Sequence, residues 1–501
     1  ATMTAELWDD SKRATPAPTL VKFTAEDTPS NYLNLKVKID GVEYTTSGES
    51  GFTVRMAYGQ VYQIEITLYQ NSGTANYKYL DMKFPDNRKV SGTSLAVLYN
   101  GGSKFKLYFK NLDNLYWTGL SSLLAGSKPQ CTGDNNLWSN PCNWADGEGN
   151  VLVTPPLPTD DIMFTDCAIW PVGYEPRVDG GATAQSLSID QGCDVYWAGT
   201  GGDLTISTTL QIEGGSINSA TNTSRINIGG DLYIAESAGS RGSIFFDNVS
   251  LYVSGNIYIG ANTDFAGDTN GNLILQGASS NIENSSDNFI IDFLVVDKNS
   301  GEKLTVLNDL GQTAAGTGST IREMEVDGGI IDLTDNKIGI RNKLLMKNSS
   351  QIIGDNILSG IIVRGHDSAV TPIYMQDSST ISLQRGSILV QPDIDNMGQP
   401  VEVPVASGSK AIHMVGSSSI ILDNALISTT NNLDDSGWDM LVEGNAVLKL
   451  SNSSYLNVDR SLTISSSKAE IYSSTVTTGY ETVGHGALTL SAGSIKIDYP
   501  T

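Results

Sequence analysis

One short phrase returns through a long stretch of this chain that contains no proline, and this recurrence limits the possible folds more than any other feature. Proline is absent between Arg177 and Val370. Within that stretch, Gly with Asp or Asn precedes an apolar, variable, apolar triplet at residues 202–206, 230–234, 255–259 and 271–275. A chain that turns and then presents alternate side chains inward builds one coil of a β-solenoid. The recurrence therefore predicts a parallel solenoid over residues 186–501.

The phrase changes in the second half of this region. A pair of small polar residues then precedes the strand, as in residues 348–352, 377–381 and 452–456. Serine and asparagine suit the corners of coils because their hydroxyl and amide groups can bond to nearby backbone. At roughly 25 residues per coil, the region has room for about a dozen coils.

The composition favours an all-β protein with more than one domain. The chain has 501 residues, of which 39% are apolar and 51 are glycine. These values fit many short strands joined by turns, and no long amphipathic helix is predicted. No apolar run approaches the roughly 20 residues of a transmembrane segment. The sequence begins at Ala1 rather than Met, as after removal of a signal peptide, so we expect an exported protein, extracellular or on the cell surface.

The net charge of −24 is unevenly distributed. Residues 1–115 hold 13 basic and 12 acidic residues, whereas the remainder holds 18 basic and 43 acidic residues. An acidic body excludes nucleic acid as a natural partner of the solenoid. It favours solubility and divalent cations, and it permits weak head-to-tail attraction to the near-neutral amino-terminal part.

Residues 1–18 read as a strand followed by a linker. Ala1, Met3, Ala5 and Leu7 share one face of the alternating pattern, and prolines in the linker favour extended backbone. Such a donor strand could insert into the open edge of a neighbouring copy and build a head-to-tail homopolymer. Pairing within its own domain is one alternative, and a dimer formed by swapping is another.

Residues 19–115 are predicted to form an antiparallel β-sandwich. Strictly alternating runs occur at residues 32–39, 61–68 and 104–109, separated by turn residues. The region is rich in tyrosine, which could bind sugars but is also favoured in strands.

Residues 116–185 are predicted to form a module that caps the first coil, since an open solenoid end exposes apolar side chains. Tryptophan and proline concentrate here, as do Cys131, Cys142 and Cys167, and the fourth cysteine, Cys193, follows the module. In an exported protein an even set of cysteines indicates disulfides, and we expect pairing in chain order, Cys131 with Cys142 and Cys167 with Cys193. Other pairings, free thiols or a four-cysteine metal site are the alternatives, although no C-x2-C spacing is present.

The same module carries a resemblance. The motifs Trp117-Thr118-Gly119, Trp138, Asn143-Trp144 and the run at 158–164 precede strand repeats. Residues 116–235 thereby resemble the opening module of secreted bacterial surface proteins, which are adhesins, surface-layer components and cell-envelope proteins. The resemblance implies a right-handed parallel β-helix after the module. An insertion at 120–133 and the lack of a recognisable sorting domain are departures from the pattern.

Few residues suggest catalysis. Arg364, His366 and Asp367 form the sharpest cluster, because enzymes that act on acidic polysaccharides use basic and carboxylate groups on adjacent coils. A solvated loop is the alternative. His413 and His485 have no metal-ligand spacing, and no triad motif is present.

Calcium is the one cofactor that the sequence suggests. Oxygen ligands gather in one loop at Asp264, Asp268, Asn270 and Asn272. A second group is at Asp393, Asp395 and Asn396, although neither matches a full calcium-loop pattern.

These observations together predict an exported, non-enzymatic, all-β protein with an amino-terminal sandwich, a disulfide-stapled cap and a β-helix. The expected function is structural, as a subunit of a cell-surface filament or layer with an adhesive role. A polysaccharide-binding or polysaccharide-cleaving β-helix is the alternative, which the sparse aromatic residues after Phe293 disfavour.

Overall fold

The computed structural model divides the chain into two compact units, Ala1–Pro176 and Arg177–Thr501. It describes residues 2–6, 18–23, 34–39, 42–46, 52–57, 61–69, 79–83, 104–111, 114–119, 131, 134, 136–146, 151–164, 176–197, 202–218, 225–237, 239–313, 319–365, 370–393, 409–430, 438–465, 467–479, 487–491 and 494–498.

The first unit contains two four-stranded sheets. The first has the order β1 (Thr2–Glu6), β6 (Val61–Tyr69), β3 (Asn34–Ile39) and β4 (Val42–Thr46). The second has the order β5 (Phe52–Ala57), β2 (Pro18–Phe23), β8 (Lys104–Asn111) and β7 (Tyr79–Lys83). Neighbouring strands are antiparallel except β7 and β8, which are parallel. Face-to-face packing of the two sheets as a sandwich stays a prediction.

The rest of the first unit folds around aromatic rings. Its elements are β9 (Asn114–Trp117), a single 3-10 turn η1 (Pro141–Asn143), β10 (Trp144–Ala145) and β11 (Asp161–Phe164). The buried rings of Trp117, Trp138 and Phe164 surround Trp144 at centroid distances of 4.9, 4.9 and 5.6 Å. The predicted Cys131–Cys142 disulfide is confirmed and fastens the segment that carries Trp138.

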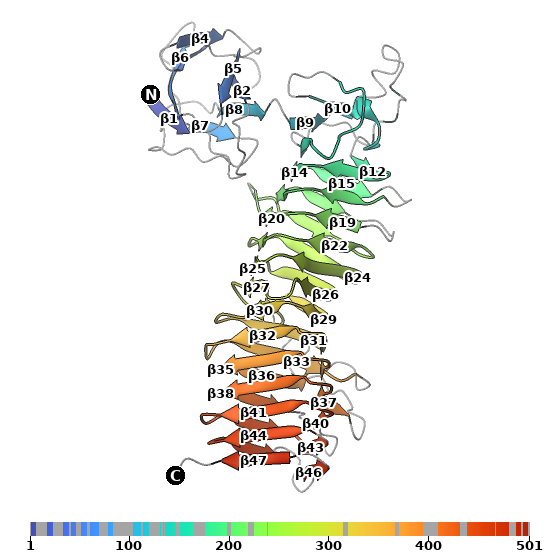
Figure 1. Ribbon diagram of the computed structural model, residues 1–501. Coiled ribbons are helices and arrows are strands. Elements are labelled where there is room, and N and C mark those ends of the chain that lie inside the picture. The colour runs from blue at the N-terminus through green and yellow to red at the C-terminus, as the bar shows by residue number, and fades with distance from the viewer. Residues whose placement is uncertain are drawn as a thin grey trace. The chain divides into compact units, whose positions relative to one another are not determined.

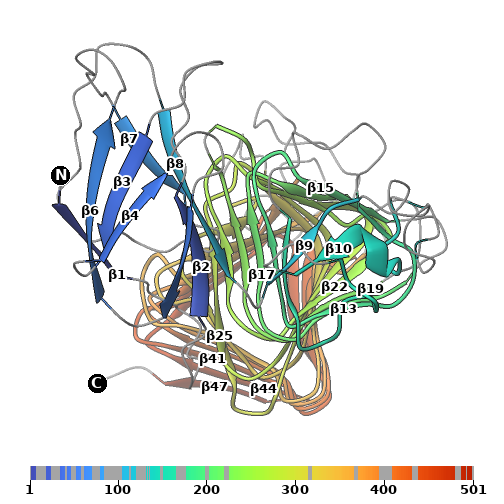
Figure 2. The same cartoon turned by 90° about the horizontal axis from the view of Figure 1, so that it is seen from above.

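The second unit is a parallel β-solenoid of about 11 turns, as the recurring phrase predicted. Figure 1 shows the coils stacked one on another, and Figure 2 shows them superposed when viewed from above. One sheet has the order β14 (Ser186–Ile189), β17 (Leu210–Glu213), β20 (Leu232–Ala235), β23 (Ile257–Ile259), β25 (Ser280–Asn284), β27 (Lys303–Val306), β30 (Ile330–Asp332), β32 (Gln351–Gly354), β35 (Thr380–Gln384), β38 (Ser419–Asp423), β41 (Val447–Ser451), β44 (Lys468–Tyr472) and β47 (Ser494–Asp498).

The remaining strands form a 23-stranded sheet that bends between two strands of the same coil. Its strands are β12 (Arg177–Val178), β13 (Ala182–Ala184), β15 (Asp194–Trp197), β16 (Leu204–Ile206), β18 (Ser216–Asn218), β19 (Arg225–Ile228), β21 (Ser243–Phe245), β22 (Ser250–Val253), β24 (Asp264–Gly277), β26 (Asn288–Lys298), β28 (Leu310–Gly311), β29 (Thr320–Gly328), β31 (Lys337–Met346), β33 (Gly360–Gly365), β34 (Ile373–Met375), β36 (Ser387–Pro392), β37 (Lys410–Met414), β39 (Leu426–Thr429), β40 (Asp439–Glu443), β42 (Tyr455–Val458), β43 (Ser461–Ser465), β45 (Thr475–Thr478) and β46 (Ala487–Ser491). Pairing between coils already begins at Arg177, before residue 186 at which we expected the solenoid to start.

The core of the solenoid consists of columns of apolar side chains, mostly aliphatic, with Phe246, Phe265 and Phe289 in contact within it. In one column Leu187 pairs with Leu210, which in turn pairs with Leu232, and the three side chains are at most 1% exposed. Alternate residues of each strand point outward, which explains the period-two pattern in the sequence. Burial of one continuous apolar column through the coils is the main stabilising term of such a fold.

The corners of the coils explain the second repeated phrase. Asn348 and Asp377 have φ angles of +57°, and Gly416 takes the equivalent position in the next coil at +68°. Small polar residues and glycine adopt this left-handed conformation most readily. The corners stack as predicted, because the backbone N–H of Ser378 donates to Asn348 O at 2.9 Å and that of Ser417 donates to Asp377 O at 2.6 Å.

The prediction that corner hydroxyls bond to backbone is correct for one set of serines and wrong for another. Ser454 Oγ donates to Ser451 O at 2.6 Å and accepts from the Ala425 N–H at 3.2 Å. By contrast, Ser350 and Ser379 Oγ atoms are buried and have no hydrogen-bond partner. At this corner the backbone N–H and C=O groups bond to the backbone of the neighbouring coil. The position therefore requires a small side chain and does not require a hydroxyl group.

Within the described parts of the chain, no helix is long and apolar enough to span a membrane.

Candidate functional site

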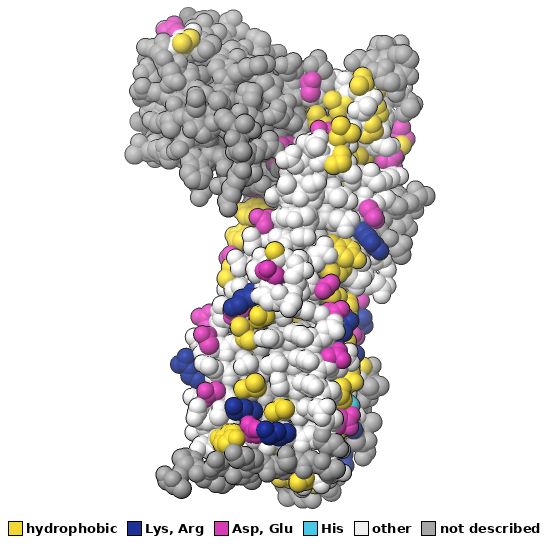
Figure 3. Space-filling model, in the orientation of Figure 1, with side chains coloured by type: hydrophobic (Ala, Val, Ile, Leu, Met, Phe, Trp, Pro, Cys, Tyr) yellow, Lys and Arg dark blue, Asp and Glu magenta, His cyan; other side chains and the backbone are white. Residues whose placement is uncertain are grey.

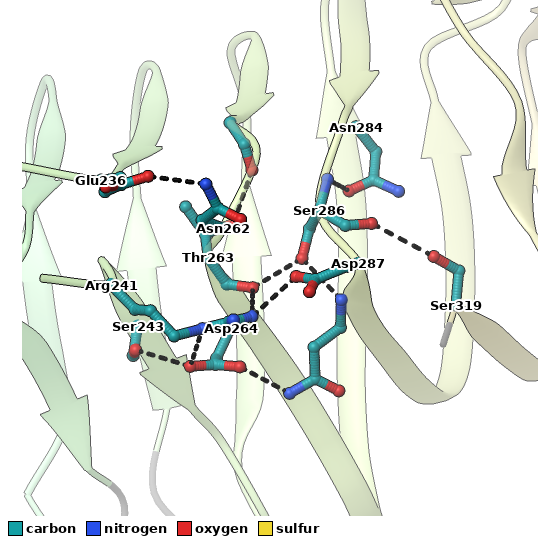
Figure 4. Close-up of polar contacts among 12 residues, drawn as sticks. Glu236, Arg241, Ser243, Asn262, Thr263, Asp264, Asn284, Ser286, Asp287 and Ser319 are labelled. Carbon is teal, nitrogen blue, oxygen red and sulfur yellow. Dashed lines mark hydrogen bonds and ion pairs between the residues drawn. The ribbon is translucent and has the colours of Figure 1, made fainter. Parts of the chain in front are cut away.

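The first predicted calcium ligand, Asp264, lies at the start of β24 and is held by side chains of the preceding and the following coil (Figure 4). Its Oδ2 accepts from Arg241 Nε at 2.9 Å and from Ser243 Oγ at 3.2 Å. Its Oδ1 accepts from Asn288 Nδ2 at 2.7 Å. A carboxylate that already accepts three hydrogen bonds has little capacity left for a metal ion.

Arg241 ties Asp264 to the next coil. Its guanidinium also donates to Asp287 Oδ1 at 2.7 Å and to Thr263 O at 2.8 Å. The hydrogen bond and charge of Arg241 lower the pKa of Asp287, and the hydrogen bond to Asp287 raises the pKa of Arg241. Because Arg241 and Asp287 are exposed to solvent, each pair contributes only about 0–1 kcal/mol. The arrangement is an inter-coil contact.

The other predicted calcium ligands lie along strand β24 rather than in the predicted loop, and they do not converge on Asp264. Asn270 donates its N–H to Asp292 Oδ2 at 3.1 Å and its Nδ2 to Asn248 Oδ1 at 3.0 Å. Asn272 donates to Ser250 Oγ at 3.3 Å, and Asp268 is exposed. Across the described residues, no three His, Cys, Asp or Glu side chains are grouped so that they could hold a metal ion. Calcium binding by these residues stays a prediction.

A second cluster joins two candidates that the sequence placed in separate loops. Arg364 of β33 pairs in register with Gln391 of β36, and Asp393 follows two residues later. Asp393 Oδ2 accepts from Arg341 Nε of β31 at 3.0 Å. Arg364 is 5% exposed and Asp393 is fully buried. Burial lowers the pKa of Arg364, and the charge of Asp393 partly opposes that shift.

Arg364 Nε has no hydrogen-bond partner, which sets this arginine apart from the bonded arginines described above. The partners expected from the sequence, His366 and Asp367, lie outside the described residues, as do Asp395 and Asn396.

Trp438 packs directly on the backbone beside Arg364. A Cβ atom added to Gly365 would lie 2.1 Å from Trp438 Cη2, so only glycine fits there. The indole is 3% exposed, and the backbone N–H of Trp438 donates to Asp459 Oδ2 at 3.0 Å. Trp438 therefore forms one wall of the cluster.

A third cluster was missed from the sequence. His413 Nε2 lies 2.9 Å from Glu443 Oε1, and the His413 ring lies 5.2 Å from the ring of Tyr374. The three residues come from β34, β37 and β40, which are neighbouring strands. His413 has no carboxylate near it in sequence, so only the coil register reveals the pair. His485 lies outside the described residues.

One buried lysine also belongs to the inter-coil contacts. Lys298 is 2% exposed, and its Nζ donates to Gln276 O of the previous coil at 2.9 Å. Burial lowers the pKa of Lys298 to about 8, and the charge of Glu302 opposes that shift.

Aromatic side chains on the outside of the solenoid stack on each other. Tyr233 and Tyr258 lie 4.8 Å apart at an interplanar angle of 8°. Burial raises the pKa of Tyr233, with smaller contributions from Glu213 and Tyr258. Because the two rings cover one face of each other, they offer less surface for stacking on a sugar.

The predicted donor strand pairs within its own chain in this structure. In β1, Met3 faces Ile64 and Ala5 faces Tyr62 of β6, in an antiparallel pair at the edge of the sheet. Ala1 and Leu7, the other two residues of the predicted apolar face, lie outside the described residues.

Only one cysteine of the second predicted disulfide lies among the described residues. Cys193 is disulfide-bonded, and Cys167 lies outside the described residues. No described cysteine is free, which removes the free-thiol alternative for Cys131, Cys142 and Cys193.

Many polar side chains of the described solenoid thus bond to the neighbouring coil, and acidic and basic groups are interspersed on the face that Figure 3 shows. Comparison of the chain with protein-family models, with curated proteins and with solved structures gives no match.

Proposed function

We propose that this protein is an extracellular structural subunit of a cell-surface filament or layer, in which the solenoid is a rigid spacer. One observation carries the proposal: the polar side chains of the solenoid are used for bonds between coils. Arg241, Asp264 and Asn270 all hold residues one coil away. An enzyme would instead converge such groups on a substrate. Export and adhesion belong to the proposal by the resemblance of residues 116–235 to secreted bacterial surface proteins.

We further propose that copies are joined by exchange of β1. The strand has five residues, lies at the edge of its sheet and contacts β6 alone in the sheet order. An edge strand on a linker can leave its sheet at low cost, and the β1 of another copy can take its place with the same hydrogen bonds. When each copy donates β1 to one neighbour and accepts β1 from another, exchange gives a chain of subunits, whereas reciprocal exchange between two copies gives a closed dimer.

A cysteine pair tests the exchange. Thr4 faces Gln63 across β1 and β6, so Thr4→Cys with Gln63→Cys places two thiols at opposite positions of the pair. Exchange predicts disulfide-linked multimers on a non-reducing gel, which collapse to monomer on reduction. Lys38→Cys with Glu43→Cys is the matched control, because those residues face each other across β3 and β4 of one copy and must link within the chain.

Two results decide the matter. Multimers from the β1 and β6 pair with monomers from the control support exchange between copies. A pair that closes fully within monomers at every protein concentration contradicts it.

A polysaccharide-cleaving function is the second candidate, and the His413–Glu443 pair is the observation that favours it. A carboxylate that orients a histidine is the arrangement of a general base, and Tyr374 lies beside it. If the protein cleaves an acidic polysaccharide, His413→Ala should reduce the rate at least 100-fold. The Thr463→Ala variant, two coils further on the same outward row, is the control. Unchanged cleavage by His413→Ala would remove this assignment.

A further inference from the structure

Arg364 is a buried cation whose Nε lacks a hydrogen-bond partner. Asp393 acts on Arg364 through its charge, and Arg341 follows Ile340 on the adjacent strand. A buried charge without adequate partners costs several kcal/mol, so such a group needs a compensating interaction. Structural arginines elsewhere in the solenoid do not share this property, since Arg241 and Arg322 are bonded to carboxylates and partly exposed.

Basic groups outnumber acidic groups among the described residues that adjoin Arg364. Asp393 is 3.0 Å from Arg341 Nε, so one carboxylate serves two guanidinium groups. Gln391, which faces Arg364 on the next coil, is neutral. On the preceding coil, the carboxylate of Glu323 accepts from Asn342 Nδ2 at 3.0 Å and lies in register with Lys343. Among the described residues, the cluster of Arg341, Arg364 and Asp393 therefore holds two guanidinium groups and one carboxylate.

The two arginines lie on adjacent coils and on the same face of the sheet. Ile340 faces Val363 in register, and both of these side chains are buried in the core. The next residue of each strand, Arg341 and Arg364, points to the outer face, with the strands about 4.8 Å apart. The Arg341 side chain is 40% exposed, so the cluster is open to solvent on that side.

We propose that Arg364 and Arg341 together bind one oxyanion, a carboxylate or sulfate group of the kind that acidic sugars carry. A guanidinium presents parallel N–H donors that match the two oxygens of such a group, and two guanidiniums one strand spacing apart can share it. Asp393 orients Arg341 through their hydrogen bond, and Trp438 excludes water on the side of Gly365. The acidic surface of the chain would repel a polyanion that contacts many residues, so we expect the site to bind one carboxylate or sulfate group.

The test measures anion-specific stabilisation of the full-length chain. The melting temperature is followed against sodium sulfate and sodium glucuronate, with sodium chloride at equal ionic strength as the reference. We expect a saturable rise with both oxyanions, absent in Arg364→Met and requiring at least tenfold more anion in Arg341→Met. Arg322→Met is the control, because Arg322 is paired with Asp292 and 52% exposed, and it should keep the response of the wild type.

A second measurement separates the possible sources of the anion. Binding of glucuronate is compared with binding of an oligosaccharide of alternating uronic acid by calorimetry. An oligosaccharide that binds at least tenfold more tightly identifies a glycan ligand, and equal affinities identify a free small anion. Both outcomes depend on Arg364.

Two results would overturn the proposal. One is a wild-type response that is not saturable beyond that of chloride, and the other is an undiminished response in Arg364→Met. If Arg364→Met does not fold, crystals of the wild type soaked in selenate decide, since an anomalous peak within hydrogen-bond distance of Arg364 is required. The site does not rest on the proposed filament function, and its failure leaves the cysteine-pair experiment unaffected.

Discussion

Three buried serines at one corner of the solenoid should be replaceable by alanine with a gain in stability. Ser350, Ser379 and Ser418 take equivalent places in successive coils, are fully buried, and have Oγ atoms without a hydrogen-bond partner. The next coil has Ala446 at this place, also fully buried. The corner therefore already accepts a methyl group.

The size of the effect follows from desolvation of the hydroxyl. A buried polar group without a partner costs about 1–3 kcal/mol, so each Ser→Ala change should stabilise the solenoid by about 1 kcal/mol. The free energy of unfolding of the triple variant should rise by about 3 kcal/mol if the three sites act independently. Contacts between the coils can make the three effects non-additive. Ser454→Ala is the matched control at a fully buried corner. It removes two hydrogen bonds and leaves the Ala425 N–H unpaired, so it should destabilise by about 1–2 kcal/mol.

Chemical denaturation with hydrogen-exchange readout suits a solenoid, because the coils can open locally. Exchange protection around the corner should rise in Ser379→Ala and fall in Ser454→Ala. Equal losses of protection in the two variants would refute the reasoning, since they would mean that the Ser379 hydroxyl has a partner after all.

Three further changes test other parts of the structure. Lys298 has a folded pKa of about 8 against the usual 10.5, so wild-type stability should rise by at most about 3 kcal/mol between pH 8 and 10.5, where the unfolded chain binds more protons. In Lys298→Met this rise should vanish from the denaturation curves, and a parallel rise would count against a buried cation. Gly365→Ala should lower the melting temperature, because its Cβ meets the Trp438 ring, and Gly365→Ala with Trp438→Leu should restore part of the loss. Cys131→Ser should lose about 3 kcal/mol in the Trp-rich module, from a loop of 11 residues, and an unchanged melting curve under oxidising conditions would contradict the role of the disulfide.

The recurring phrase predicted the fold because parallel coils impose local rules on the sequence. Each coil needs a turn and then an alternating strand, so Gly230 and Gly255 stack one coil apart, and the Gly255 N–H donates to Gly230 O at 2.9 Å. The repeated sequence of Gly, Asp or Asn and an alternating strand occurs at more than one corner of the coil. The strand after Gly202 belongs to the bent sheet, whereas the strand after Gly230 belongs to the other. Different corners need the same tight turn before a strand, so the same sequence pattern appears at each of them.

The clusters were harder to predict because coil length varies. Arg364 and Asp393 were each singled out, but their proximity depends on a register between β33 and β36 that the sequence does not state. His413 and Glu443 are 30 residues apart, so local spacing gave no signal. A register built from the buried columns, such as Ile412 with Met440, could have found that pair.

The account depends most on assembly through the amino-terminal strand. Negative-stain electron microscopy of the purified protein, with and without residues 1–15, tests this most directly. The account predicts filaments or linear oligomers for the full chain and single particles for the truncated one. Single particles in both samples, or filaments in both, would contradict exchange of β1 as the contact between copies.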